Sequence, residues 1–187
     1  MKVPRAYTQI ARAESVAATR RRIVEATAAA LGRSPEPTLA EVAGRAEVSV
    51  QTVLRHFGSR DALIVETAGL LAAERAAAPG DPVPAVRALY WQYERRGDAN
   101  IQLLAREGGD PAVKRLMDRG RALHRDWVAE VFAPPLRSRP AAGRDVLVDL
   151  LVVATDVYTW KLLRRDRRLS RRAAEARVVR LVEGILR

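Results

Sequence analysis

Apolar side chains recur along this chain at intervals of three and four residues, and strict alternation of apolar and polar residues is hard to find. The first spacing places apolar residues on one face of a helix, whereas alternation would indicate a half-buried strand. Within residues 19–31, one helical face carries Ile23, Ala26, Thr27, Ala30 and Leu31. The pattern therefore predicts an all-α protein.

Glycines, prolines and capping residues divide this pattern into about nine predicted helices. They cover roughly residues 19–31, 38–46, 49–57, 59–71, 84–96, 100–107, 111–131, 142–165 and 170–186. Residues 1–17 are expected to be a frayed arm. The stretch "AAAPGDPVP" after the fourth helix predicts a boundary between two bodies, which we place at residues 1–66 and 67–187.

Two of the predicted helices are short and are separated by only a few residues, within about 38–57. Thr38 can cap the first of them, with Glu41 three residues later as the partner in a capping box. Ser49 can cap the second, whose outer face carries polar residues that burial alone does not require. Two short helices with a tight turn between them are typical of a helix-turn-helix, in which the second helix enters the major groove of DNA. Residues 1–66 are therefore interpreted as a DNA-binding domain.

Small and polar side chains at the start of that second helix can approach base edges, and cations around it can contact phosphates. The candidate DNA-binding residues are Arg20, Thr38, Ser49, Val50, Gln51, Thr52, Arg55, His56 and Arg60. Some of them also have purely structural interpretations. Thr38 and Ser49 would cap helices in any case, Arg20 could belong to a solvated helix start, and His56 could be a local hydrogen-bond partner.

The segments "TRRRIVEATAAALG" and "TLAEVAGRAEVSVQTVLRHFGSRDALI" together resemble the N-terminal domain of TetR-family transcriptional regulators. The shared features are an Arg-flanked first helix, a Thr-capped second helix and a recognition helix that ends in His-Phe. The chain departs from the family pattern at two positions. Leu54 stands where the family usually has a Tyr that touches phosphate, and Glu47 stands in the turn where Gly is usual.

The resemblance implies a sequence-specific DNA-binding transcriptional regulator, most often a homodimeric repressor that a small-molecule ligand releases from a pseudo-palindromic operator. It also implies that residues 67–187 bind the ligand and dimerise through the last two helices. From helical phase, the candidate ligand-binding residues are Tyr90, Tyr93, Leu104, Leu123, His124, Trp127 and Asp156. The aromatic residues could equally belong to the core, and Asp156 could instead form an ion pair at the dimer interface, because a charge that faces a core needs a partner.

The net charge of +11 favours a polyanionic partner. Residues 1–70 hold ten basic and seven acidic side chains, however, so most of the excess lies in the second body. The run "KLLRRDRRLSRR" at Lys161–Arg172 is interpreted as a solvated helix end, or alternatively as a second anionic contact. The alternative function is a helical protein that binds nucleic acid without sequence preference, or a membrane surface.

Several function classes lack the residues they would need. The chain has no cysteine, two histidines and no glycine-rich phosphate loop, so we expect neither an enzyme nor a cofactor or metal site. No apolar run approaches the roughly 20 residues that a membrane span requires. With no apolar leader segment either, the protein is expected to be cytoplasmic.

Overall fold

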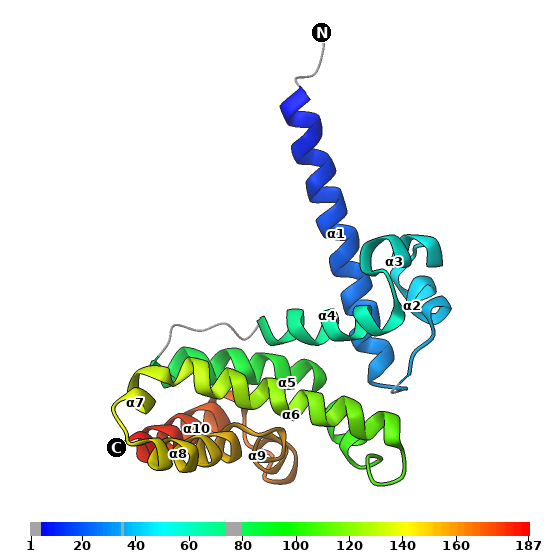
Figure 1. The fold of residues 1–187 in the computed structure, drawn as a ribbon. Coiled ribbons are helices and arrows are strands. Elements are labelled where there is room, and N and C mark those ends of the chain that lie inside the picture. The colour runs from blue at the N-terminus through cyan, green and yellow to red at the C-terminus, as the bar shows by residue number, and fades with distance from the viewer. Residues whose placement is uncertain (1–4, 35, 74–79) are drawn as a thin grey trace. The chain divides into compact units, whose positions relative to one another are not determined.

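The computed structural model describes residues 5–34, 36–73 and 80–187 (Figure 1). The described residues form helices and no strand, which confirms the all-α fold class. The α-helices are α1 (Arg5–Leu31), α2 (Leu39–Ala46), α3 (Val50–Phe57), α4 (Arg60–Ala73), α5 (Pro82–Leu104), α6 (Pro111–Val131), α7 (Ala133–Arg137), α8 (Ala141–Thr155), α9 (Val157–Lys161) and α10 (Arg171–Leu186), and a π-helical segment, η1, covers Leu162–Asp166.

Contacts divide the chain into two compact units, with the division after Leu70. In the first unit α2 packs against α1, and α3 packs against α2 (Figure 1). Its core is formed by side chains from the four helices α1, α2, α3 and α4. These residues are Ile23, Val24, Ala26, Ala30, Val42, Ala43, Ala46, Val53, Phe57 and Leu63. Ile23, Ala26 and Ala30 belong to the face that the three-and-four spacing predicted for residues 19–31.

The core of the second unit lies among α5, α6, α8, α9 and α10. The largest side chains that are fully buried in it are Tyr90, Phe132, Trp160, Leu89 and Leu151. Asp110 begins α6 by accepting hydrogen bonds from the backbone amides of the first turn, and Ser170 begins α10 in the same way. Both starts were predicted from the sequence.

The prediction that residues 1–17 fray is wrong for the described part of that segment, because α1 begins at Arg5. Residues 13–18 are exposed, so packing does not explain the helix there. The segment is rich in Ala, which favours a helix without tertiary support. Residues 1–4 lie outside the described part of the chain.

The prediction of two separate helices over 84–96 and 100–107 is also wrong. α5 runs without a break through Gly97, and Asp81 caps it by accepting a hydrogen bond from Val83 N at 2.9 Å. Position 97 leaves no room for a side chain, because the ring of Trp160 packs against the backbone there. A β-carbon on residue 97 would lie 2.5 Å from that ring.

The single helix predicted over 142–165 is interrupted at Asp156. α8 ends at Thr155, and Asp156 adopts an extended backbone (φ −68°, ψ 154°) and caps α9. Its carboxylate accepts a hydrogen bond from Tyr158 N at 2.7 Å. Short polar side chains that bond to nearby backbone groups compete with helix continuation, which accounts for the break. The short helix α7 lies between the predicted helices 111–131 and 142–165, where the sequence predicted no helix.

Candidate nucleic-acid interface

Local hydrogen bonds set the start of each helix in the two-helix motif. Thr38 Oγ1 accepts from Glu41 N at 3.1 Å, and Ser49 Oγ accepts from Thr52 N at 3.1 Å. Each bond satisfies one of the amide groups that a helix start leaves without an intrahelical partner. The caps therefore fix where α2 and α3 begin, as the sequence pattern predicted.

The turn between α2 and α3 places a non-glycine residue in the left-handed region. Glu47 has φ 54° and ψ 45°, and Val48 N donates to Ala43 O at 3.0 Å to close the end of α2. A left-handed backbone costs about 1–2 kcal/mol in a residue with a β-carbon. This is the position where the family pattern has Gly, so the turn keeps the same kind of backbone at a strain cost.

One face of α3 is buried and the other is open. Val53 and Phe57 lie in the core of the unit. On the outer face Val50 and Leu54 are 37% and 36% exposed, and Gln51 and Arg55 are also exposed. Thr52 is half-buried, and its hydroxyl lies 2.9 Å from that of Ser49. The predicted reading residues therefore share the outer face and the first turn of α3, and Leu54 is exposed on the same outer face.

The predicted cations around α3 differ in what they contact. Arg55 is exposed and makes no ion pair within the described residues. Arg60 forms two long ion pairs. Its guanidinium lies 3.6 Å from the carboxylate of Glu36 and 3.8 Å from that of Asp61. Both side chains can reach solvent, where a phosphate could approach them.

Arg20 is held by contacts within the unit instead. Its Nη1 donates to the carbonyl of His56 at 2.8 Å, its Nη2 pairs with the carboxylate of Glu66, and its guanidinium carbon lies 4.6 Å from the ring centroid of Phe57. These contacts come from α3 and α4, up to 46 residues away in sequence. The helical periodicity of α1 alone does not predict these contacts.

His56 is half-buried at the end of α3. Burial, and then the nearby charges of Arg55 and Arg20, lower the pKa of its imidazole below the ordinary value of 6.5. In the free protein at neutral pH the ring is therefore mostly uncharged. It can form a hydrogen bond to a phosphate, but it supplies little positive charge.

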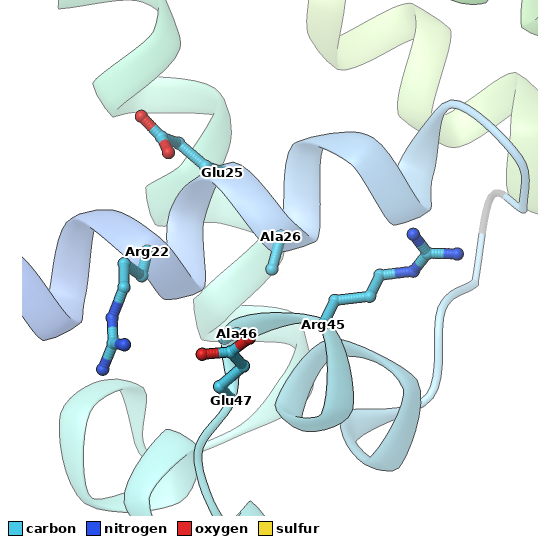
Figure 2. A pocket seen from close by; sticks show the side chains of 6 residues that line it. All are labelled: Arg22, Glu25, Ala26, Arg45, Ala46 and Glu47. Atoms are coloured by element: carbon cyan, nitrogen blue, oxygen red, sulfur yellow. The ribbon is translucent and has the colours of Figure 1, made fainter.

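A hollow between α1 and the end of α2 was not predicted from the sequence (Figure 2). Its lining residues are Arg22, Glu25, Ala26, Arg45, Ala46 and Glu47. Figure 2 shows the side chains of Arg22 and Arg45 at opposite ends of it. Two arginines and two glutamates line the same space, so the hollow has no excess of charge that would select an anion.

In the second unit, the predicted ligand-binding residues form mainly core contacts. Tyr90, Tyr93, His124 and Trp127 are buried, whereas Leu104 and Leu123 are half-buried. The His124 ring stacks on Trp127, with centroids 5.6 Å apart. Asp156, also half-buried, is the cap of α9, and burial raises the pKa of its carboxyl.

Thr155 connects two of these residues and was not among the predicted ones. Its hydroxyl lies 3.1 Å from His124 Nε2 and donates to Leu151 O at 2.7 Å, and its carbonyl accepts from Tyr93 Oη at 3.0 Å. This node joins α5, α6 and the end of α8. Tyr90 differs from its neighbour Tyr93. Its hydroxyl is buried and has no hydrogen-bond partner among the residues that the structure describes, and burial strongly raises its pKa.

The basic run at 161–172 is only partly solvated. Arg164 forms a two-point ion pair with Glu94, at 2.6 and 2.8 Å, and Arg165 forms one with Asp98, with both contacts at 2.8 Å. These pairs tie η1 to α5. The prediction of a fully solvated helix end is therefore wrong for Arg164 and Arg165.

No family model and no curated protein matches the sequence. None of the described helices is long and apolar enough to cross a membrane. Within the described residues, no group of three or more His, Cys, Asp or Glu side chains could hold a metal ion.

Solved structures do match the fold. A TetR-family transcriptional regulator from Streptomyces coelicolor is similar with a TM-score of 0.59 and 18% identity, over 89% of this chain and 79% of that chain. A transcriptional regulator from Rhodococcus sp. Rha1 is similar with a TM-score of 0.54 and 19% identity, over 89% of this chain and 95% of that chain. The chain therefore has the fold of a TetR-type transcriptional regulator.

Proposed function

We propose that this protein is a sequence-specific DNA-binding transcriptional regulator that acts as a homodimer and is released from its operator by a small molecule. The observation that carries the proposal is the open outer face of α3. A helix of eight residues with capped ends holds its buried side chains in a small core and leaves its opposite face free. A helix of this kind fits the major groove of DNA.

The residues of α3 supply suitable chemistry for reading bases. The amide of Gln51 can bond to both N6 and N7 of an adenine, and the Thr52 hydroxyl can bond to a base or a phosphate. The apolar side chains of Val50 and Leu54 can contact thymine methyl groups. Because Leu54 cannot bond to phosphate as a Tyr would, we expect this protein to prefer a different operator from family members that carry the Tyr.

Phosphate contacts would set the position of α3 on the duplex. Thr38 is exposed at the amino end of α2, where free amide groups and the helix dipole favour an anion. Arg55 and Arg60 lie on and just after α3 and can reach solvent. These three residues could hold the two strands while α3 lies in the groove.

An exposed apolar stripe on α8 supports the homodimer. Val146, Leu150 and Val153 recur at helical spacing and are 59%, 47% and 66% exposed. Exposed apolar patches on soluble proteins commonly mark association surfaces. To enter successive major grooves of a pseudo-palindrome, the two α3 helices of such a dimer would have to lie about 34–36 Å apart.

The core of the second unit supports a ligand site. The buried hydroxyl of Tyr90 has no partner among the described residues, and a ligand with a polar group could satisfy it. A ligand that releases DNA must bind the DNA-free state more tightly than the DNA-bound state. The node of Tyr93, His124 and Thr155 connects three helices, so a ligand that disturbs it would affect all three.

Selection of genomic fragments by the purified protein at about 0.15 M salt tests the proposal. Wild type is compared with Thr52→Ala, in which the backbone amide of residue 52 can still bond to the Ser49 cap. We expect wild type to enrich one short inverted repeat and the variant to lose that enrichment. Diffuse binding that is the same for both proteins would overturn the assignment of α3.

Diffuse binding would favour a second candidate function, a protein that binds nucleic acid without sequence preference or a membrane surface. The observation behind it is the exposure of Arg167 and Arg168 just before α10 and of Arg172 in its first turn. Charge reversal of these three arginines would then abolish binding. If the main proposal is right, the same change leaves the selected repeat unaltered.

A further inference from the structure

We propose that Arg20 is a positioning residue that holds the recognition helix α3 in its reading orientation, and that it does not contact DNA phosphate. The inference rests on the proposed function of α3. It concerns the geometry between α1, α3 and α4, and it replaces the phosphate contact expected from the sequence.

The guanidinium of Arg20 is held on three sides. Nη1 bonds to the carbonyl of His56 at 2.8 Å, Nη2 pairs with Glu66 of α4, and the planar group lies over the ring of Phe57 with its carbon 4.6 Å from the centroid. Phe57 itself is 7% exposed and belongs to the core of the unit. A single side chain of α1 therefore connects the end of α3 to the first half of α4.

These contacts lie at the carboxyl end of α3. The carbonyls of the last helical turn have no intrahelical partner, and a cation there is favoured by the helix dipole. The Ser49 cap fixes where α3 begins, and the buried side chains of Val53 and Phe57 hold the helix to the core. Rotation or sliding of α3 would break the Arg20 bond to the His56 carbonyl and unpack these side chains. Hydrogen bonds to base edges tolerate only a few tenths of an ångström, so this restraint matters for reading.

The same contacts make Arg20 a poor phosphate ligand. Glu66 neutralises much of its charge, and its Nη1 already donates to the carbonyl of His56. The next residue of α1, Arg21, is exposed to solvent. Arg21 is thus a matched control, because it has the same charge and lies on the same helix without the three contacts.

The salt dependence of binding separates positioning from phosphate contact. Affinities for the selected repeat and for a scrambled duplex are measured at several salt concentrations for wild type, Arg20→Gln and Arg21→Gln. A lost phosphate contact lowers the slope of log K against log salt by about 0.9 in each protomer and weakens both duplexes. We expect Arg20→Gln to weaken the repeat at least tenfold while the scrambled duplex and the slope stay unchanged.

If Arg20 only stabilised the fold, its replacement would lower the free energy of unfolding without changing how the folded protein reads DNA. Binding is therefore measured well below the unfolding temperature of every variant, with circular dichroism to confirm the fold. Glu66→Gln breaks the ion pair from the α4 side and should also reduce the preference for the repeat. The reversed pair, Arg20→Glu with Glu66→Arg, should recover part of the preference lost in Arg20→Glu alone.

Each outcome decides the inference. A reduced salt slope in Arg20→Gln would make Arg20 a phosphate contact, and an unchanged preference in folded Arg20→Gln and Glu66→Gln would make it a stability residue only. If Arg20→Gln does not fold, Glu66→Gln and the reversed pair decide between these results. Wild type without any preference among duplexes would overturn the proposed function itself, which is a distinguishable failure.

Discussion

Gly97 of α5 lies directly against the indole of Trp160 in α9, so closely that a β-carbon on residue 97 would lie 2.5 Å from Cζ3 of the ring. The indole is fully buried, and its Nε1 donates to Glu94 Oε1 at 2.9 Å. Arg165 covers the ring, with its guanidinium carbon 4.4 Å from a ring centroid. The contact explains why a glycine stands in the middle of a long helix.

We therefore expect Gly97→Ala to lower the free energy of unfolding by about 1–3 kcal/mol, because the added methyl group overpacks this contact. Gly120→Ala in α6 is the matched control. A β-carbon added at Gly120 would have nothing within 4 Å, so this change should raise stability by about 0.5–1 kcal/mol. Urea denaturation followed by tryptophan fluorescence measures both. Equal stability of Gly97→Ala and wild type would contradict the close contact.

Removal of the hydroxyl group should change the stability of the protein differently at the two tyrosines of α5. Tyr90→Phe removes a buried hydroxyl that has no partner in the described part of the chain, so stability should stay the same or rise by up to about 1 kcal/mol. Tyr93→Phe removes the donor to Thr155 O, so stability should fall by about 1 kcal/mol. Thermal and urea unfolding compare the pair. A larger loss in Tyr90→Phe than in Tyr93→Phe would show that the Tyr90 hydroxyl has a partner.

Because the pKa of His56 is lowered in the native state, the free energy of unfolding should depend slightly on pH. The pKa of His56 in the native state lies below the unfolded value of 6.5, so between the two values the unfolded chain binds more protons. Stability should therefore fall as the pH drops below about 6.5 and level off below the native pKa. Titration by NMR gives the pKa directly, and His56→Gln should remove this part of the dependence. A native pKa at or above 6.5 would be the opposite result.

The stripe on α8 predicts a dimer that a single charge can disrupt. Val153 is 66% exposed, and Val153→Asp would place a carboxylate in the apolar interface. Sedimentation equilibrium should show a dimer for wild type and a monomer for this variant. Val83→Asp, at an exposed valine in the first turn of α5, is the control and should stay dimeric. A wild-type monomer at every concentration tested would exclude the proposed interface.

Features that depend on neighbours in the sequence were predictable here. Thr38 and Ser49 cap helices through bonds to residues three positions later, so the sequence pattern contains both partners. The buried faces of α2 and α3 follow from helical spacing in the same way, as Val42 and Val53 illustrate. Fold class and the two-helix motif rest on such local features.

Features that depend on distant partners were not predictable. Arg20 meets Glu66 across 46 residues, and Arg164 meets Glu94 across 70, so no periodic pattern connects them. Gly97 favours a helix end in the sequence because glycine usually weakens helices, whereas the ring of Trp160 requires it. At Asp156 the side chain prevailed over an apolar helical pattern by capping a new helix.

The most direct test of the central claim is the ratio of affinities for the selected repeat and for a scrambled duplex of equal length, measured at one salt concentration. A regulator that reads DNA through α3 should prefer the repeat by about 10³-fold or more. Gln51→Ala should reduce that ratio by about 5–150-fold, which corresponds to one lost base contact. A wild-type ratio near one, or a ratio that Gln51→Ala leaves unchanged, would contradict the reading of DNA by this helix.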